Sequence, residues 1–368
     1  MPNGKAIFFS AIRRQAAERN RMNDRFYGGC DPPIPWIGGK TMLLPVIKRI
    51  IPEYPKKFVD VFGGGGSVSL SGRIAPVQIY NDYNFHLVNF MRVTKTRADD
   101  LVNKLMGAFN SDGSLNEDLR RRFFINSRDF FNIASHVFYK GEEWEGLYDA
   151  NLKTLSKAST LREKQHAQWL ADTAWEAYRE YNRDSELMDA VFFYILMKCS
   201  YSATGTSWAC KPVNYDSIVR LINEANRMLQ CIIIENKDCI DLIKLHDGQG
   251  TFIYCDPPYY LAEDLYNSIA PFKDDKHKEL HDTLLQCESK VLISYNECDF
   301  IDKLYCEDKW YKMRLSRPHN MVLHNGAGAL YNEFLIANYD IFELYSYGRQ
   351  TTFFDELNDL NEEGRLIL

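Results

Sequence analysis

The chain has 368 residues, of which 45% are hydrophobic and 26% charged, a composition typical of a soluble globular protein with one large or two modest domains. A formal net charge of −6 is unusual for a nucleic-acid-binding protein, and no apolar run reaches the roughly 18–20 residues of a membrane span. Nine cysteines form no C-x-x-C pair or zinc-like cluster, and the first residues lack a secretory signal. We therefore expect a cytoplasmic protein with reduced thiols, no metal and no membrane partner.

Charge is distributed unevenly along the chain. Residues 1–49 carry nine Lys or Arg and three Asp or Glu, a net charge of +6, which leaves −12 for the remainder. Residues 1–30 are expected to form a basic extension, which is either a solvated helix face or a contact to phosphates, because a local basic face acts within a Debye length of about 8 Å. Residues 346–368 are expected to form an acidic C-terminal tail.

The first half of a doubly wound α/β sheet is predicted within residues 31–94. Apolar residues at helical spacing stop at a proline, and two short apolar runs indicate buried strands. The first strand leads into four glycines, after which we expect another helix. In chain order the expected elements are a helix over Leu43–Ile51, a strand over Phe58–Phe62, a helix from Ser67 and a strand over Val77–Tyr80 that ends at Asn81 and Asp82.

The rest of the chain divides by its patterns. Residues 95–230 are charged and helical in pattern, which indicates an inserted domain, whereas residues 231–345 again alternate strand and helix patterns. The predicted fold class is therefore α/β, with an open Rossmann-like sheet formed by residues 31–94 and 231–345. The strands expected in the second part are Cys231–Ile234, Thr251–Tyr254, Val291–Ser294 and Glu333–Ala337.

The strongest chemical signal is the run Asp256-Pro257-Pro258-Tyr259, which directly follows an expected strand. Open α/β sheets bind ligands at the carboxyl ends of their strands. A carboxylate and a proline-fixed backbone carbonyl can each accept one N–H of an aromatic amine and so localise its lone pair, and the tyrosine ring offers a face for a stacked base. For the run taken alone, a strand-ending turn is the simpler alternative.

A glycine-rich turn is the second signal. Phe62 is followed by four glycines, and such a turn lets a ligand approach the backbone closely. The turn alone would also suit a dinucleotide or a phosphate, although it lacks the G-K-[ST] of a Walker loop. Asp82 follows the next strand, where an acid either holds ribose hydroxyls or caps a helix. A third turn, Trp36-Ile37-Gly38-Gly39-Lys40, ends in a basic residue.

In combination these motifs resemble a known family. The order Trp-x-Gly-Gly-Lys, x-Phe-x-Gly-x-Gly-Ser-Val, Asn-Asp-x-Asn and Asp-Pro-Pro-Tyr is similar to that of the Dam-like (D12 class) DNA adenine-N6 methyltransferases. The matches fall in residues 34–94 and 231–345, about half of the chain. Later stretches that also resemble the family are Val291–Asn296, Ser316-Arg317, Asn325-Gly326 and Glu333–Ile336.

The resemblance implies an S-adenosylmethionine-dependent methyltransferase sheet with a mainly helical target-recognition domain inserted at residues 95–230. It implies a site-specific enzyme that flips an adenine out of double-stranded DNA and transfers a methyl group from S-adenosyl-L-methionine directly to the N6 amine. The catalytic residues would be Asp256, Pro257, Pro258 and Tyr259. The cofactor-binding residues would be Trp36, Lys40, Phe62, Gly64, Gly66, Asp82, Asp238 and Asp256.

The chain departs from the family where the target sequence is read. The family usually has a segment resembling Phe-Asn-Gly-x-x-Arg-x-Asn, and the corresponding residues 199–206 lack the Asn and the Arg that read base edges. The DNA sequence that is recognised is therefore not predicted. Residues expected to contact DNA are Arg120, Arg121 and Arg122, for which a solvated helix face is an equal alternative, and Arg314 and Arg317, which lie near a family motif.

Two other functions stay open at this point. The same enzyme class could act on an RNA adenine or a protein amide, although amide methyltransferases more often begin the motif with Asn. A degenerate member could bind DNA without methylating it, which the intact Asp256, Lys40 and Asp82 argue against. The resemblance implies a bacterial or phage-encoded protein, for which a cognate restriction endonuclease, an orphan regulatory role or phage self-modification would each fit. The oligomeric state is not predicted.

Overall fold

The structure is a computed structural model of the chain. The chain divides into two compact units, which we call the sheet unit and the helical unit. The sheet unit comprises Met1–Cys30, Lys40–Tyr83 and Cys231–Leu368, and the helical unit comprises Asp31–Gly39 and Asn84–Gln230. The residues that the structure describes are 28–108, 160, 184–203, 214–260, 272–306, 308–318, 330–346 and 366–367.

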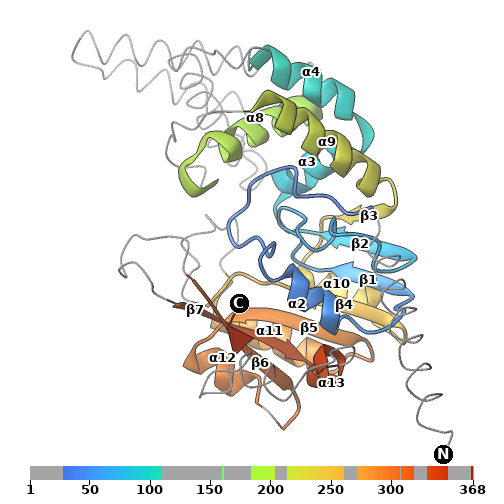
Figure 1. Ribbon diagram of the computed structural model, residues 1–368, viewed down its shortest axis with the longest axis vertical. Coiled ribbons are helices and arrows are strands. Elements are labelled where there is room, and N and C mark those ends of the chain that lie inside the picture. Colours follow the sequence, from blue (N-terminus) through green and yellow to red (C-terminus); the bar gives the residue numbers. More distant parts are fainter. Residues whose placement is uncertain are drawn as a thin grey trace, which may run out of the picture. The chain divides into compact units, whose positions relative to one another are not determined.

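The sheet unit is built on one mixed sheet with eight described strands in the order β3-β2-β1-β4-β5-β7-β6-β8 (Figure 1). The strands from β3 to β5 are parallel, and β7 runs antiparallel to both β5 and β6. The short β8 pairs parallel to β6. The strands are β1 (Lys57–Asp60), β2 (Val77–Asn81), β3 (Ile232–Glu235), β4 (Thr251–Cys255), β5 (Lys290–Asn296), β6 (Tyr311–Pro318), β7 (Leu330–Ala337) and β8 (Leu366–Ile367).

The central strands are continuous apolar runs because both of their faces are buried. Helices cover the two faces of such a sheet, so neither set of alternating side chains meets water. Val59 and Ile253 belong to one core cluster, whereas Phe58 and Phe252 belong to a second cluster and stack with ring centroids 5.6 Å apart. The two clusters fix the register of β1 against β4, since a slip by one residue would exchange the two faces.

Helices of the sheet unit contribute to one cluster or the other. Residues of α2 and α13 pack into the cluster that contains Phe58, and residues of α10, α11 and α12 pack into the cluster that contains Val59. The first of these helices ends two residues before Pro52, because a proline ring cannot continue a helix. The bounds are α2 (Leu44–Ile50), α10 (Cys239–His246), α11 (Asp274–Leu285), α12 (Asp299–Leu304) and α13 (Ile341–Ser346).

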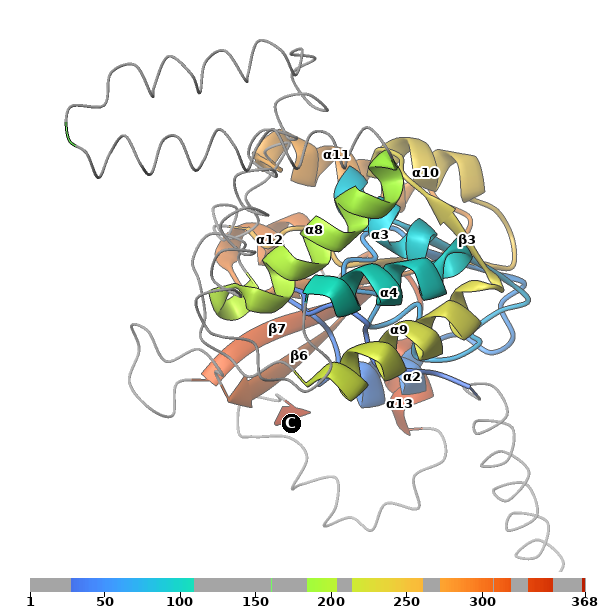
Figure 2. The same ribbon diagram turned by 90° about the horizontal axis from the view of Figure 1, so that it is seen from above.

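The described part of the helical unit consists of four α-helices and one turn of 3-10 helix (Figure 2). The side chains of Asn84, Asp184 and Asn214 cap the first turns of α3, α8 and α9. Helix α3 packs against both α8 and α9. The bounds are α3 (Phe85–Thr96), α4 (Ala98–Ala108), α8 (Ser185–Cys199), η1 (Tyr201–Ala203) and α9 (Tyr215–Leu229).

A buried polar cluster joins α3 to α8 inside the helical unit. The Nδ1 atom of His86 lies 2.6 Å from Asp189 Oδ1, and Asn89 donates to Asp189 Oδ2 at 2.9 Å. Helix α8 is apolar on nearly all sides and is buried along most of its length, so its apolar pattern alone does not determine which face packs against α3. The polar cluster therefore fixes which face of α8 meets α3, because a buried carboxylate must keep its partners.

The six strands expected from the sequence are confirmed as β1, β2, β3, β4, β5 and β7. Strand β6 was not expected, because Lys312 and Arg314 interrupt its apolar pattern. The expected helix from Ser67 is wrong: residues 67–72 form turns, with Leu70 N donating to Gly66 O and Ser71 N to Val68 O. Three serines in this segment favour turns over helix.

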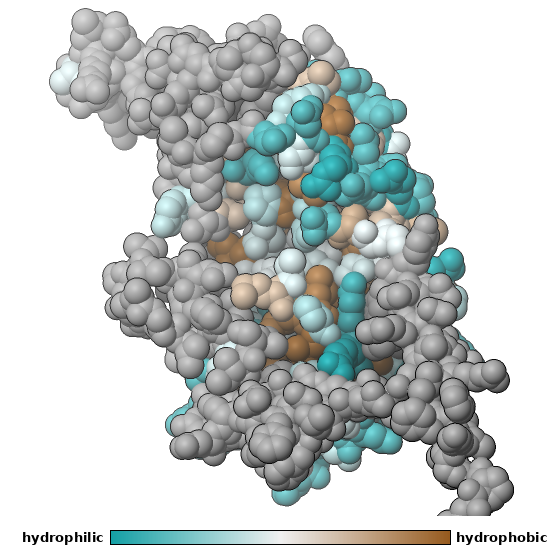
Figure 3. Space-filling view, in the orientation of Figure 1, coloured by the Kyte–Doolittle hydropathy of each residue, from teal (hydrophilic) through white to brown (hydrophobic). Residues whose placement is uncertain are grey.

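Hydrophilic residues cover much of the described surface over α4 and α9 in the view of Figure 3. Helix α9 explains this pattern, because its buried residues Ile218, Ile222, Ala225 and Leu229 recur at helical spacing and leave a polar outer face. Across the described ranges, no helix combines the length and the apolar character needed to cross a membrane.

Candidate active site

Asp256 lies directly after β4, at the carboxyl ends of the parallel strands. Its Oδ2 atom is 2.7 Å from Lys40 Nζ, and its Oδ1 atom accepts a hydrogen bond of 2.8 Å from Ser294 Oγ on β5. The Ser294 hydroxyl also lies 3.0 Å from the hydroxyl of Tyr254 on β4. Three segments that are distant in sequence therefore fix the orientation of this one carboxylate.

The electrostatics of Asp256 reflect two opposing effects. Burial raises the pKa of Asp256 above its ordinary value, whereas the charge and hydrogen bond of Lys40 and the hydrogen bond from Ser294 lower it. The side chains of Lys40 and Asp256 are only 5% and 17% exposed, so little water screens the pair. Lys40 and Ser294 thus offset part of the effect of burial, and the pKa of Asp256 stays above its ordinary value.

The residues that follow Asp256 are packed closely. Pro257 is buried and Pro258 is half-buried. The ring of Tyr259 is 4% exposed, with Lys40 Nζ 4.8 Å from its centroid and the Tyr295 ring 6.5 Å away. Its face thus makes a cation–π contact in this structure. The base-stacking role expected for Tyr259 stays a prediction.

An aromatic clamp, which was not expected from the sequence, holds the end of this loop. The Tyr260 ring stacks on Phe300 at 4.3 Å, and its carbonyl accepts a hydrogen bond of 3.0 Å from Asn296 Nδ2. The Nδ1 atom of His277 lies 2.8 Å from the Tyr295 hydroxyl, and burial lowers the pKa of His277 to about 4. A neutral imidazole is therefore part of the apolar support beneath the loop.

The glycine-rich turn after β1 depends on glycine for backbone reasons. Gly64 and Gly66 have φ values of 51° and 86°, in the left-handed region that favours glycine. Gly63 lies against the ring of Tyr80, so that an added Cβ would come within 2.2 Å of Tyr80 Cε2. The Tyr80 hydroxyl donates to Gly64 O at 2.7 Å and so fixes the turn to β2.

Asp82 follows β2 and meets this turn. Its Oδ2 atom accepts a hydrogen bond of 2.9 Å from Gly64 N. Asn236, after β3, donates from Nδ2 to the carbonyls of Asp82 at 2.8 Å and Tyr83 at 3.2 Å. The structure thus brings together Gly64 and Asp82, two residues that the sequence placed in one pocket.

Replacing Gly63 with alanine is expected to lower the stability of the protein by about 2 kcal/mol, because the new methyl group overlaps the Tyr80 ring. Thermal unfolding measures the effect. The double variant with Tyr80→Ala should lose less than the sum of the two single changes, since the smaller side chain removes the overlap. Strictly additive losses would contradict the packing described here.

Asp60 is a site residue that was not expected from the sequence. It ends β1 with its side chain buried, and its Oδ2 atom accepts a hydrogen bond of 2.6 Å from Ser69 Oγ. Burial raises the pKa of Asp60 to about 7, against the lowering effect of the Ser69 bond; the charges of Asp256 and Asp82 raise it as well. The signal in the sequence is a single acid inside the apolar run Phe58–Phe62, a pattern that by itself predicts only a strand.

Two aromatic residues expected at the cofactor have other contacts. Trp36 is part of the helical unit, where its ring lies 6.1 Å from that of Phe193. Phe193 in turn lies 6.3 Å from His86, next to the buried polar cluster of α3 and α8. Phe62 meets Phe272 edge-on at 5.7 Å in the sheet unit. The cofactor contacts of Trp36 and Phe62 stay predictions.

Asp238 has a structural role that the sequence did not indicate. Its side chain caps α10 by accepting a hydrogen bond of 2.9 Å from Ile240 N. Lys276 on α11 forms an ion pair with it, with Nζ 3.1 Å from Oδ1 and 3.0 Å from Oδ2. The carboxylate therefore links the two helices, and its predicted contact to the cofactor is untested.

The arginines expected at DNA are only partly described. Arg120, Arg121 and Arg122 lie outside the described residues, and of Arg317 the structure describes only the backbone on β6. The guanidinium of Arg314 lies 3.7 Å from Glu297 and 3.5 Å from Asp302, over the ring of Phe334. Two carboxylates thus share its charge, and the DNA contacts of all five arginines stay predictions.

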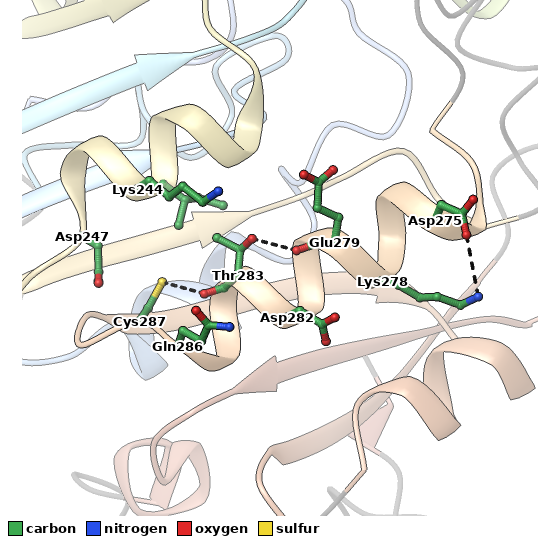
Figure 4. Close-up of a pocket in the computed structure, with 10 residues that line it drawn as sticks. Lys244, Asp247, Asp275, Lys278, Glu279, Asp282, Thr283, Gln286 and Cys287 are labelled. Atoms are coloured by element: carbon green, nitrogen blue, oxygen red, sulfur yellow. Dashed lines mark hydrogen bonds and ion pairs between the residues drawn. The ribbon is translucent and has the colours of Figure 1, made fainter.

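A separate surface pocket of about 580 Å³ lies between α10 and α11 (Figure 4). Lys244 and Asp247 line one side, and α11 lines the other, where Thr283 donates to Glu279 O and Cys287 to Thr283 O. None of the motif residues lines this pocket. In the described part of the chain, no group of three or more His, Cys, Asp and Glu side chains could hold a metal ion.

The chain is similar in sequence to known type II methyltransferases. Type II methyltransferase M1.LlaDCHI of Lactococcus lactis subsp. cremoris is 24% identical over 340 residues, covering 88% of this chain and 98% of that protein. Type II methyltransferase M.MjaIII of Methanocaldococcus jannaschii is 30% identical over 141 residues, 33% of this chain and about half (49%) of that protein.

A family model described as "D12 class N6 adenine-specific DNA methyltransferase" matches residues 36–317. The matched range covers most of the chain and includes Lys40, the glycine-rich turn, Asp82 and Asp256. The chain therefore belongs to the D12 class N6 adenine-specific DNA methyltransferases, enzymes that use S-adenosylmethionine to methylate the N6 amine of adenine in DNA.

Proposed function

We propose that this enzyme is site-specific and acts on an adenine that has been flipped out of double-stranded DNA. The observation that carries the proposal is the carboxylate of Asp256, held after β4 by Lys40 and Ser294. It lies on the same carboxyl edge of the sheet as the glycine-rich turn after β1 and Asp82 after β2. A base must leave the helix to bring its amine to such a buried group.

The residues at the glycine-rich turn fit S-adenosylmethionine. When bound, this cofactor supplies an electrophilic methyl group on a positively charged sulfur. The turn presents backbone without side chains at Gly64 and Gly66, which allows a ligand to approach closely. Asp82, whose position after β2 suits the ribose hydroxyls, is oriented by its hydrogen bond from Gly64 N.

Asp256 and the carbonyl of Pro257 would each accept one N–H of the adenine amine. These two hydrogen bonds localise the lone pair of N6, which is otherwise delocalised into the ring, and so make N6 a nucleophile. Burial raises the pKa of Asp256, and Lys40 and Ser294 oppose this effect and so favour the ionised form that the task requires. Each carboxylate oxygen accepts more than one hydrogen bond, so the incoming amine can join the existing partners.

The helical insertion, residues 95–230, would recognise the target sequence. The segment that follows α8 corresponds to the family's base-reading segment, and its Tyr201 is 50% exposed. The basic residues Arg120, Arg121, Arg122, Arg314 and Arg317 would contact phosphates, and the basic extension at residues 1–30 would add to them. Because the segment lacks the Asn and Arg of the family pattern, the target sequence is not inferred from relatives.

The biological setting is proposed from the relatives. Both are named type II methyltransferases, so a cognate restriction endonuclease that shares the target sequence is the proposed partner. A bacterial or phage-encoded enzyme in the cytoplasm fits this setting.

Modification mapping by sequencing tests the proposed function. Genomic DNA from a methylation-free host that expresses the chain is compared with DNA from a host that expresses the Asp256→Ala variant. We expect N6-methyladenine in one short sequence context, lost in the variant. Modified adenine without a sequence context would contradict site specificity. Unmodified DNA, despite soluble protein that binds S-adenosylmethionine, would move the substrate to RNA or protein.

A further inference from the structure

One carboxylate of the site has a buried oxygen without a hydrogen-bond partner among the described residues. The side chain of Asp60 is 1% exposed, and its Oδ2 atom accepts from Ser69 Oγ at 2.6 Å. Its Oδ1 atom is also buried but has no partner there. Buried polar atoms normally find one, because leaving them unsatisfied is unfavourable. This oxygen therefore indicates a group that Asp60 meets in another state, either a proton or a positively charged ligand.

The groups around Asp60 come from the strands on its two sides. In the sheet register it pairs with Tyr80 on β2 and with Tyr254 on β4. The carboxylates of Asp82 and Asp256 follow these same strands. Two further negative charges thus act on Asp60 across the carboxyl edge of the sheet, where the glycine-rich turn that follows Asp60 begins.

These surroundings disfavour a charged Asp60 in the absence of a ligand. Burial raises the pKa of Asp60 to about 7, the Ser69 bond lowers it, and the charges of Asp256 and Asp82 raise it further. The ammonium of Lys40 is 2.7 Å from Asp256 and forms an ion pair with that carboxylate. A positive charge placed beside the turn would lower the pKa of Asp60 and favour its ionised form.

We propose that Asp60 distinguishes the positively charged methyl donor from the neutral product by releasing a proton when the donor binds and regaining it after transfer. This proposal rests on the methyltransferase function above. A cofactor bound at the glycine-rich turn would present a sulfonium to Asp60 before transfer and a thioether after it. Sulfur keeps the electron pair of the broken S–C bond, while N6 gains the methyl group and loses one proton to solvent. The attraction between Asp60 and the ligand is therefore lost when the methyl group leaves.

Calorimetric titration of the full chain tests this proposal without turnover. Dissociation constants of S-adenosylmethionine and S-adenosylhomocysteine are measured at pH 6, 7 and 8. The preference for the donor is expected to rise about tenfold from pH 6 to pH 8, because the ionised fraction of a group with a pKa of about 7 rises about tenfold over this range. Titrating groups that the two ligands share cancel in the ratio. Heats in buffers of different ionisation enthalpy should show proton release for the donor alone.

Three variants identify the group responsible. Asp60→Asn should make the preference independent of pH. Ser69→Ala keeps the carboxylate but removes a hydrogen bond that lowers its pKa, so the pH midpoint should move upward. Asp256→Asn is the comparison variant: the charge of Asp256 raises the pKa of Asp60, so its removal should keep a rise with pH but move the midpoint downward. Circular dichroism checks that each variant folds. If Asp60→Asn does not fold, the role of Asp60 is tested by whether the pH midpoint of the donor preference moves upward in Ser69→Ala.

A preference that is independent of pH in the unmodified chain would overturn the role of Asp60. So would a pH dependence that survives in Asp60→Asn, or one that disappears in Asp256→Asn instead. In each of these cases both ligands still bind, so the proposed methyltransferase function stands. If S-adenosylmethionine does not bind at all, the placement of the cofactor at the glycine-rich turn and the role of Asp60 both fail.

Discussion

Replacing Asp256 with asparagine is expected to slow methyl transfer by about 10³-fold, with little change in the affinity for S-adenosylmethionine. The amide keeps the shape of the side chain and can still accept a hydrogen bond from Ser294 Oγ. It is neutral, however, so it accepts an adenine N–H less strongly and cannot pair with the Lys40 ammonium. Single-turnover transfer of a labelled methyl group to DNA, with calorimetry for the cofactor, measures the two effects separately.

The matched control for this prediction is Asp247→Asn. The Asp247 carboxylate also accepts hydrogen bonds within the sheet unit, from Ser289 N at 3.0 Å and Ser289 Oγ at 2.6 Å, but it lies at the pocket between α10 and α11. Its loss should lower stability and leave the transfer rate within about twofold. Equal losses of rate in the two variants would show a general effect of removing carboxylates and would contradict the role of Asp256.

Replacing Lys40 with methionine is expected to shift the pH dependence of the reaction upward and to slow it by about 10–100-fold at pH 7. Lys40 lowers the pKa of Asp256 against burial, so without it a larger fraction of the carboxylate is protonated at neutral pH. Activity should recover in part toward pH 9, where Asp256 ionises again. Rate profiles from pH 6 to pH 9, with DNA and cofactor saturating, measure the shift.

The Asp256 carboxyl group should also make the stability of the Lys40→Met variant depend on pH: its activity recovers as pH rises, whereas its stability falls. A carboxyl group whose pKa is raised by folding loses stability as pH rises from the unfolded value toward the folded one. At pH 8 the free energy of unfolding of Lys40→Met should therefore be about 3 kcal/mol lower than that of the unmodified chain. This difference between the two chains should become smaller toward pH 4. Denaturant unfolding at both pH values checks the sign. A gap that is constant with pH would mean that lost packing, rather than an unpaired carboxylate, causes the change.

Lys312→Met is the control for both measurements. The side chain of Lys312 is 2% exposed and pairs with Asp302 at 2.5 Å. Replacing Lys312 therefore also removes the lysine partner of a carboxylate. Asp302 is much more exposed than Asp256, at 43% against 17%, so the stability cost should be smaller. The pH profile of the reaction should not move, because neither residue touches Asp256.

The sheet was largely predictable from the sequence because its strands are short apolar runs that end at polar residues. The order of the strands in the sheet was harder to predict, because β1 pairs with β4, which lies on the other side of the insertion in the sequence. Strand β6 was not predicted because Lys312 and Arg314 interrupt its apolar pattern, although their charged groups lie over the ring of Phe334. The turns after Ser67 replaced an expected helix because Ser69 binds Asp60, a contact that no local pattern reveals.

The site, too, was only partly predictable from the sequence. Motif order placed Asp256, Asp82 and the glycines on one edge of the sheet, and the hydrogen bond between Gly64 and Asp82 confirms that two of these positions meet. Lys40 and Asp256 were expected in one pocket, but their direct ion pair was not predicted. Trp36 lies only four residues before Lys40 in the sequence, yet it belongs to the other compact unit. Such partners are set by tertiary packing, which spacing along the chain does not record.

The adjacency of β1 and β4 also has a consequence for how the enzyme is made. Asp60 and Tyr254 pair directly in the sheet, although the whole helical insertion separates them along the chain. Pairing over such a sequence distance closes a long loop and is intrinsically slow. During synthesis from the N-terminus, the glycine-rich turn and Asp82 leave the ribosome well before Asp256 and Ser294. A nascent chain therefore carries its cofactor turn early, but it becomes an enzyme only when its late strands have paired with its early ones.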